Sequence, residues 1–132
     1  MALFHRFVSQ QERRSFNGSA YMEFQFCKLS ARTPMKQIVS TGSIEHWQLD
    51  SLYVADSDMN LFYSQYSQIF DDGICNNLQR GPVDMWGINY YAPSKIDAIL
   101  DRLTQVKPAD YESLSAWLVQ AKGFNGFYIL GI

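Results

Sequence analysis

The two histidines and two cysteines are the residues best suited to catalysis or metal binding. Neither His5 nor His46 has a Cys or His neighbour at the spacing of a local zinc site, so no such site is predicted. Glu45 beside His46 could form a general-base pair. Cys75 could act as a nucleophile if the fold brought His5 or His46 to it. Cys27 and Cys75 both lie among apolar residues, and we expect two buried free thiols.

Oxygen-bearing side chains at Asp56, Asp58 and Asn60 match the first three ligand positions of a calcium-binding loop. The sixth position of such a loop needs glycine for its sharp turn, and this chain has Leu61 there. The twelfth position needs a bidentate carboxylate, and this chain has Ser67. The pattern therefore favours helix capping over calcium binding, and we predict no metal site.

The glycines and basic residues match no motif for binding nucleotides or nucleic acid. The spacing of Gly123 and Gly126 fits neither a P-loop nor a dinucleotide fingerprint. Arg13-Arg14 is a lone basic pair rather than a stripe interleaved with aromatic residues. We therefore predict no cofactor, no nucleic acid partner and no enzymatic activity.

Acidic residues are concentrated in the middle third of the chain. Residues 37–84 contain seven of them against Arg80 alone, although the whole chain has a net charge of only −2. An acidic surface disfavours nucleic acid as a partner and favours a basic protein. The same residues could instead be turn residues and helix caps scattered over several faces. The seven are Glu45, Asp50, Asp56, Asp58, Asp71, Asp72 and Asp84.

Alternating and short apolar runs predict the strands that must position these side chains. In residues 20–28, apolar residues alternate with Glu23 and Gln25, which is typical of a half-buried strand. Residues 37–41 and 44–49 flank Gly42-Ser43 as a predicted hairpin. Further strands are predicted at 52–54, at 84–91 with Trp86, Ile88 and Tyr90 on one side, and at 127–130, whereas 75–82 is predicted to be a loop.

Apolar stripes at helical spacing predict three helices, over residues 58–70, 94–106 and 109–122. Tyr63 lies off the stripe of the first helix and Tyr66 lies on it, so we expect Tyr63 to be exposed and Tyr66 to be buried. A short helix near the start of the chain is also expected, from Leu3, Phe4, Phe7 and Val8. The predicted core contains Phe24, Phe26, Phe62, Ile69, Ile88, Ile99, Leu103, Leu114, Leu118 and Ile129.

Length and composition are those of one α+β domain, residues 1–132. Single domains most often have about 100–150 residues, and 47% hydrophobic residues supply a core. The mixed order of elements favours a mainly antiparallel sheet packed with about three helices. No apolar run approaches the roughly 18 residues of a membrane span, and His5-Arg6 interrupts the apolar opening. We therefore expect a cytoplasmic protein without a membrane segment.

The end of the chain resembles a known class of proteins. Residues 86–91 (WGINYY) and 126–132 (GFYILGI) flank the last two predicted helices. This arrangement, with the small size, acidity and aromatic richness, resembles the carboxy-terminal half of small bacterial toxin-immunity proteins, including those of contact-dependent growth inhibition systems. The resemblance implies a protein that binds one cognate toxin domain and blocks its active site. Nuclease toxins have basic clefts because they bind phosphates, and an acidic face complements such a cleft.

We therefore predict a partner-binding face made of the middle-third acids and nearby exposed aromatics. Aromatic anchors carry most interface energy, and charges at the rim set the association rate. The predicted partner is a basic protein toxin domain. The alternatives are a small enzyme that combines Cys75 with His46 and a regulatory or scaffold domain with another protein partner. The candidate binding residues are Glu45, Trp47, Asp50, Tyr53, Asp56, Asp58, Tyr63, Asp71 and Asp72.

Overall fold

A six-stranded antiparallel sheet organises the computed structural model, which describes residues 2–16, 20–45 and 47–131. Its strand order is β2-β1-β6-β5-β3-β4, and every neighbouring pair is antiparallel. The strands are β1 (Tyr21–Phe26), β2 (Leu52–Ala55), β3 (Gly73–Cys75), β4 (Arg80–Gly81), β5 (Ile88–Tyr91) and β6 (Phe127–Leu130). The α-helices are α1 (Gln10–Ser15), α2 (Met35–Ile38), α3 (Met59–Tyr66), α4 (Ile96–Val106) and α5 (Tyr111–Ala121). Short 3-10 turns are η1 (Thr41–Ser43), η2 (Asp56–Asp58) and η3 (Pro93–Lys95).

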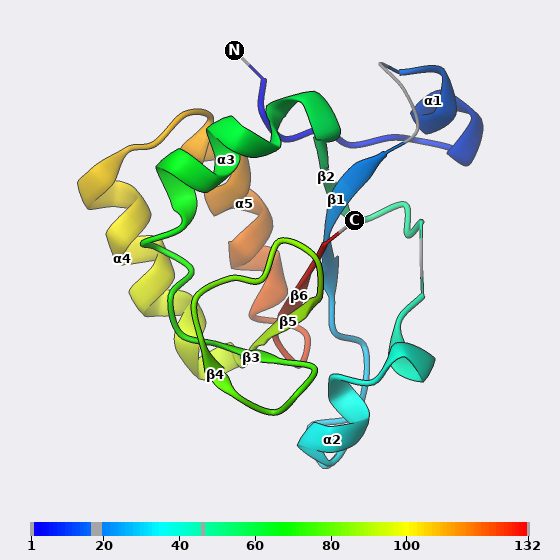
Figure 1. Cartoon of the computed structure of the whole chain (residues 1–132), viewed down its shortest axis with the longest axis vertical. Helices are drawn as coiled ribbons and strands as arrows, with labels where there is room; N and C mark the ends of the chain where they lie inside the picture. Colours follow the sequence, from blue (N-terminus) through cyan, green and yellow to red (C-terminus); the bar gives the residue numbers. More distant parts are fainter. Residues whose placement is uncertain (1, 17–19, 46, 132) are drawn as a thin grey trace.

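The predicted α+β class is confirmed, with three longer helices packed on one face of the sheet. Helices α3, α4 and α5 have 8, 11 and 11 residues and lie on the same side in Figure 1. Phe24 of β1 is at the centre of this layer, in edge-to-face contact with Phe62, Phe70 and Trp117. All the predicted core residues are buried except Ile88, which is half-buried.

The predicted alternation of β1 is confirmed, but the prediction of a half-buried strand is wrong. All six residues of β1 are buried, including Glu23 and Gln25 on the side away from α3, α4 and α5. That side is covered by Phe7 and Phe16 near α1 and by α2 and the chain that follows it. Burial of these polar side chains requires hydrogen-bond partners, which the covering chain supplies.

The predicted hairpin of residues 37–41 and 44–49 is wrong. Pro34 opens a helical turn, in which its carbonyl accepts from the amides of Gln37 and Ile38. Residues 44–49 form no strand in the described part of the chain, because side chains of β1 bond their backbone in place of a strand partner. Gln25 donates to the carbonyl of Glu45, and the Glu23 carboxylate accepts from the amides of Trp47 and Gln48.

The strand predicted at 84–91 is shorter than expected. Its first four residues form a turn, because the Asn89 side chain bonds both the amide and the carbonyl of Asp84. The Asp84 carboxylate in turn accepts from the amide of Trp86. These bonds take the place of backbone hydrogen bonds to a neighbouring strand, so β5 begins only at Ile88. The indole of Trp86 points outward and is 73% exposed.

The predicted loop at 75–82 contains part of a β-hairpin, and the N-terminal helix lies later than expected. Strands β3 and β4 pair through Gly73 and Gly81, around a turn in which Leu78 has a φ of 66°. Neither strand has the length or alternation that a sequence pattern requires. At the start of the chain, His5 pairs with Tyr53 as extended backbone, and α1 begins only after its N-cap, Ser9.

The predicted helix positions are confirmed to within a few residues. Pro93 opens η3, which leads directly into α4, and Lys107 ends α4 in the left-handed conformation. Trp117 of α5 stacks on Phe26 of β1 with ring centroids 4.2 Å apart. None of the helices in the described ranges combines the length and the apolar character that crossing a membrane requires.

We expect Gly126→Ala to lower the free energy of unfolding by about 2–4 kcal/mol. Gly126 has a φ of 77°, and an added Cβ would collide with the carbonyl oxygen of Tyr91. Gly42→Ala is the matched control, because no atom lies within 4 Å of its added Cβ. Urea denaturation should show a change within about 0.5 kcal/mol for the control. Equal free energies of unfolding for the two variants would contradict the claim that a side chain at position 126 is strained.

Candidate functional site

The residues predicted to bind a partner lie in three separate places rather than on one face. Asp71 and Asp72 line a pocket beneath α4. Residues 45–53 include the chain that covers the second face of the sheet, together with the start of β2. Asp56, Asp58 and Tyr63 belong to η2 and the outer side of α3. These acids therefore belong to several different elements of the fold.

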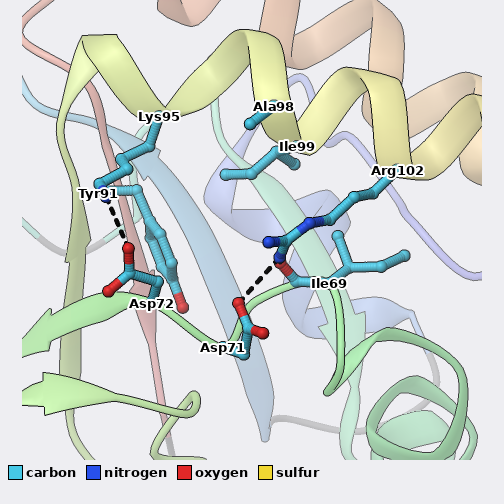
Figure 2. Close-up of a pocket in the computed structure, with 8 residues that line it drawn as sticks. All are labelled: Ile69, Asp71, Asp72, Tyr91, Lys95, Ala98, Ile99 and Arg102. Carbon is cyan, nitrogen blue, oxygen red and sulfur yellow. Dashed lines mark hydrogen bonds and ion pairs between the residues drawn. The ribbon is translucent and has the colours of Figure 1, made fainter.

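The pocket beneath α4 contains side chains of both charges (Figure 2). Arg102 extends from α4 to Asp71, with 2.8 Å between Nη1 and Oδ1, and also donates to the carbonyl of Ile69. Lys95, at the end of η3, lies 2.5 Å from Oδ2 of Asp72. Arg80 of β4 reaches the same carboxylate at 2.9 Å. These ion pairs tie α4 and β4 to the segment between α3 and β3.

The pocket has a volume of about 120 Å³, and both polar and apolar side chains line it. Tyr91 of β5 and Ile99 of α4 supply ring and aliphatic surface, and Figure 2 shows the Tyr91 ring between the two aspartates and α4. Burial raises the pKa of the Tyr91 phenol, so it stays protonated and donates to the carbonyl of Phe70 at 3.4 Å. The Tyr91 phenol therefore acts in this pocket as a hydrogen-bond donor and not as a proton acceptor at neutral pH.

The charges of the pocket neutralise one another. Hydrogen bonds from Lys95 and then Arg80 lower the pKa of the Asp72 carboxyl from 3.8 to about 2. Both aspartates are about half-exposed, so solvent screens these pairs. Asp71 and Asp72 thus present little uncompensated negative charge to a partner, and their contacts are those of residues that join elements.

The segment from Glu45 to Tyr53 is mostly engaged with the sheet. Trp47 is half-buried and has the Arg13 guanidinium over its ring. The carboxylate of Asp50 forms a 2.9 Å ion pair with Lys28. The prediction that Tyr53 is an exposed aromatic is wrong, because it is 2% exposed and its hydroxyl donates to the carbonyl of Gln48. Glu45 is exposed, with its carboxylate accepting from the side-chain amide of Gln48.

Asp56 and Asp58 belong to η2, and Tyr63 belongs to α3, which follows it. Tyr63 is 48% exposed and Tyr66 is fully buried, as the helical stripe predicts. The capping role predicted for Asp58 is not observed, since its side chain makes no cap hydrogen bond. The carboxylates of Asp56 and Asp58 form no ion pair with any residue in the described ranges. They therefore present uncompensated negative charge at the start of α3.

The cysteine–histidine alternative is only partly described. His46 lies outside the described residues. Both thiols are free, and Cys27 is buried as expected, whereas Cys75 is partly exposed rather than buried. Burial, and then the nearby charge of Asp84, raise the pKa of the Cys75 thiol. A raised pKa leaves less thiolate at neutral pH, which disfavours Cys75 as a nucleophile.

The sequence patterns missed Trp86, the most exposed tryptophan. Alternation placed it on the same side of a strand as Tyr90, which is 2% exposed. The turn at 84–87 instead releases it to solvent, beside a hollow of about 200 Å³ lined by Ile44, Ile88 and Leu130. The signals in the sequence were Asp84 and Gly87, residue types that favour the first and last positions of a turn.

Comparison of the chain with protein-family models, with curated proteins and with solved structures gave no match. Within residues 2–16, 20–45 and 47–131, no group of three or more His, Cys, Asp or Glu side chains is arranged to hold a metal ion. The surfaces of the protein are therefore the guide to its function.

We expect the Asp72 carboxyl to titrate near pH 2 in an NMR experiment, below its ordinary value of 3.8. Because the folded-state pKa is lowered, the stabilising ion pairs are complete above about pH 4 and are lost as the pH falls through about 2. Lys95→Met should move the midpoint upward, toward 3.8. Lys122→Met is the matched control, because Lys122 pairs with Asp97 instead. A midpoint that is unchanged in Lys95→Met would show that the Lys95 contact is not what lowers this pKa.

Proposed function

We propose that this protein binds another protein and inhibits it, as an immunity protein that covers the active site of a cognate toxin. The observation that carries the proposal is the surface of η2 and α3, here called the α3 surface, formed by Asp56, Asp58, Asn60 and Tyr63. It combines two carboxylates that have no cationic partner among the described residues with a half-exposed aromatic ring. Aromatic anchors flanked by charges are typical of protein interfaces.

Helical spacing places three of the four residues of the α3 surface in one row. Asp56, Asn60 and Tyr63 are spaced by four and three residues, and all three are exposed. Met59, Phe62 and Tyr66 are buried against the sheet, so the opposite side of the helix points away from it. The C-terminal part of the helix is also anchored, because the Tyr66 hydroxyl donates to the carbonyl of Ala109 at 2.6 Å. A rigid helix that presents its side chains outward loses little conformational freedom on binding.

The charge of the α3 surface favours a basic partner. Four of the other aspartates, at positions 50, 71, 72 and 97, are paired with lysine or arginine, whereas Asp56 and Asp58 have no such partner in the part of the chain that is described. An unpaired carboxylate attracts a basic cleft and speeds the encounter with it. A nuclease toxin has such a cleft because it binds phosphates. We accordingly place the protein in the cytoplasm, where it would meet the toxin before the toxin acts.

We expect the double reversal Asp56→Lys/Asp58→Lys to slow association with the toxin about tenfold or more at low salt. The candidate partner is the product of the gene directly upstream, because an immunity gene follows that of its toxin. Stopped-flow measurement at several salt concentrations should also show a weaker salt dependence for the variant. Asp101→Lys is the control, because Asp101 is exposed on α4 with no ion pair within the described residues. An association rate equal to that of the wild type would refute the role of these aspartates.

We expect Tyr63→Ala to raise the dissociation rate of the same complex about tenfold or more, with little change in association. Tyr63 is off the buried stripe, so the folded protein should keep its stability. Surface plasmon resonance measures the rate, and thermal denaturation checks the fold. Val119→Ala, at an exposed apolar position on α5, is the matched control and should dissociate like the wild type. If Tyr63→Ala dissociates at the wild-type rate, the Tyr63 ring does not contribute to the interface.

A further inference from the structure

The turn between β4 and β5 carries a second recognition feature, which does not depend on the α3 surface. We propose that Trp86, Asp84 and Asn76, here called the Trp86 site, bind one arginine side chain of a protein partner. The site lies at the hollow of about 200 Å³ on the face of the sheet opposite α3, α4 and α5. Ligand pockets for small molecules are usually about 300–1,000 Å³. The smaller hollow is better suited to a single side chain.

Two oxygen acceptors lie near Gly87, which lines this hollow together with Asn76 and Trp86. A Cβ added to Gly87 would lie 2.6 Å from Oδ2 of Asp84 and 3.8 Å from Oδ1 of Asn76, so both oxygens point to the space above a residue without a side chain. The Asp84 amide bond to Trp86 uses the other carboxylate oxygen, Oδ1. Neither Asp84 Oδ2 nor Asn76 Oδ1 accepts a hydrogen bond within the described ranges. The two oxygens are available to a ligand that donates more than one hydrogen bond.

The chemistry of the site selects a guanidinium group. Asp84 is an exposed carboxylate with no ion pair among the described residues, so its charge favours a cationic ligand. The exposed indole of Trp86, two residues away, provides a π surface of the kind that attracts cations most strongly. Arginine has a planar fork that can donate to both oxygens and stack on an indole, whereas lysine is a point charge. The aliphatic part of the arginine can rest on Ile44 and Ile88, which line the hollow.

The backbone of the turn that carries Asp84 and Trp86 is held in place by hydrogen bonds before a partner binds. Asn89 holds the amide and the carbonyl of Asp84, at 2.7 and 2.8 Å, and also donates to the carbonyl of Ile129 in β6 at 3.0 Å. The amide of Gly131 donates to the carbonyl of Gly87 at 2.8 Å. These bonds join the turn to two central strands of the sheet. An exposed tryptophan on a braced turn needs little ordering when a partner docks, which favours affinity.

The test uses a pentapeptide with one central arginine flanked by glycines, titrated into the full protein at 150 mM salt. Two-dimensional NMR follows the indole N–H signals of the three tryptophans. We expect a saturable shift of the Trp86 signal and none for Trp117, whose indole donates to the carbonyl of Asp50. The lysine peptide should bind more weakly, and the peptide with uncharged citrulline should not bind. An equal response to citrulline, or tighter binding of free arginine amide than of the peptide, would overturn the proposal.

Three variants separate the site from general attraction to an acidic protein. Asp84→Asn keeps the side-chain oxygen that accepts from the Trp86 amide but removes the negative charge. This variant should bind the arginine peptide about tenfold more weakly. Trp86→Ala, in which the backbone amide signals of residues 84–88 replace the missing indole signal as the readout, should weaken binding at least as much. Gly87→Ala should block the space between the two oxygens. Asp101→Asn, on α4, should bind like the wild type. An unshifted Trp117 signal shows that each variant is folded, and wild-type affinity in Asp84→Asn would overturn the proposal. The outcome is independent of the toxin experiments on the α3 surface.

Discussion

The buried carboxylate of Glu23 is the constraint on which the second face of the sheet depends. It is 5% exposed and sits on a strand whose two sides are both covered. A carboxylate in this position is stable only if donors surround it. Ser51 donates to it at 2.6 Å, Gln25 at 3.1 Å, and the amides of Trp47 and Gln48 at 3.4 Å. These bonds place the chain that leads into β2.

Other contacts follow from that placement. With Trp47 against the sheet, its ring can receive the Arg13 guanidinium from α1, so the N-terminal helix is joined to the same cluster. Asp50 comes to lie where its carbonyl accepts from the indole of Trp117, at 2.8 Å. Trp117 stacks on Phe26, and so the polar contacts of one face are connected to the aromatic core of the other. A polar group inside the fold thus specifies where apolar layers meet.

The acidic residues of the middle third have different physical roles because their surroundings differ. Asp50, Asp71 and Asp72 are used to join elements, each through a lysine or an arginine distant in sequence. Asp84 shapes a turn with one oxygen and leaves the other open. Asp56 and Asp58 keep their charge uncompensated by any described residue. Net charge along the chain therefore overstates the acidic surface, and the location of the positive partners decides which carboxylates a second protein would meet.

The sequence by itself determined the elements whose pattern is local. Periodicity accounts for helices α3, α4 and α5, for strand β1, and for the burial of Tyr66 and the exposure of Tyr63, since a helix or strand that packs on a core must repeat its apolar residues. Strands β2 and β6 follow from short apolar runs. Only the tertiary structure decided that Tyr53 is buried, that residues 44–49 cover β1 instead of forming a strand, and that Trp86 is exposed. It also decided which aspartates meet Lys28, Lys95 or Arg102. These outcomes depend on hydrogen bonds and ion pairs between residues far apart in the chain, such as Glu23 with Ser51, and no local period encodes such contacts.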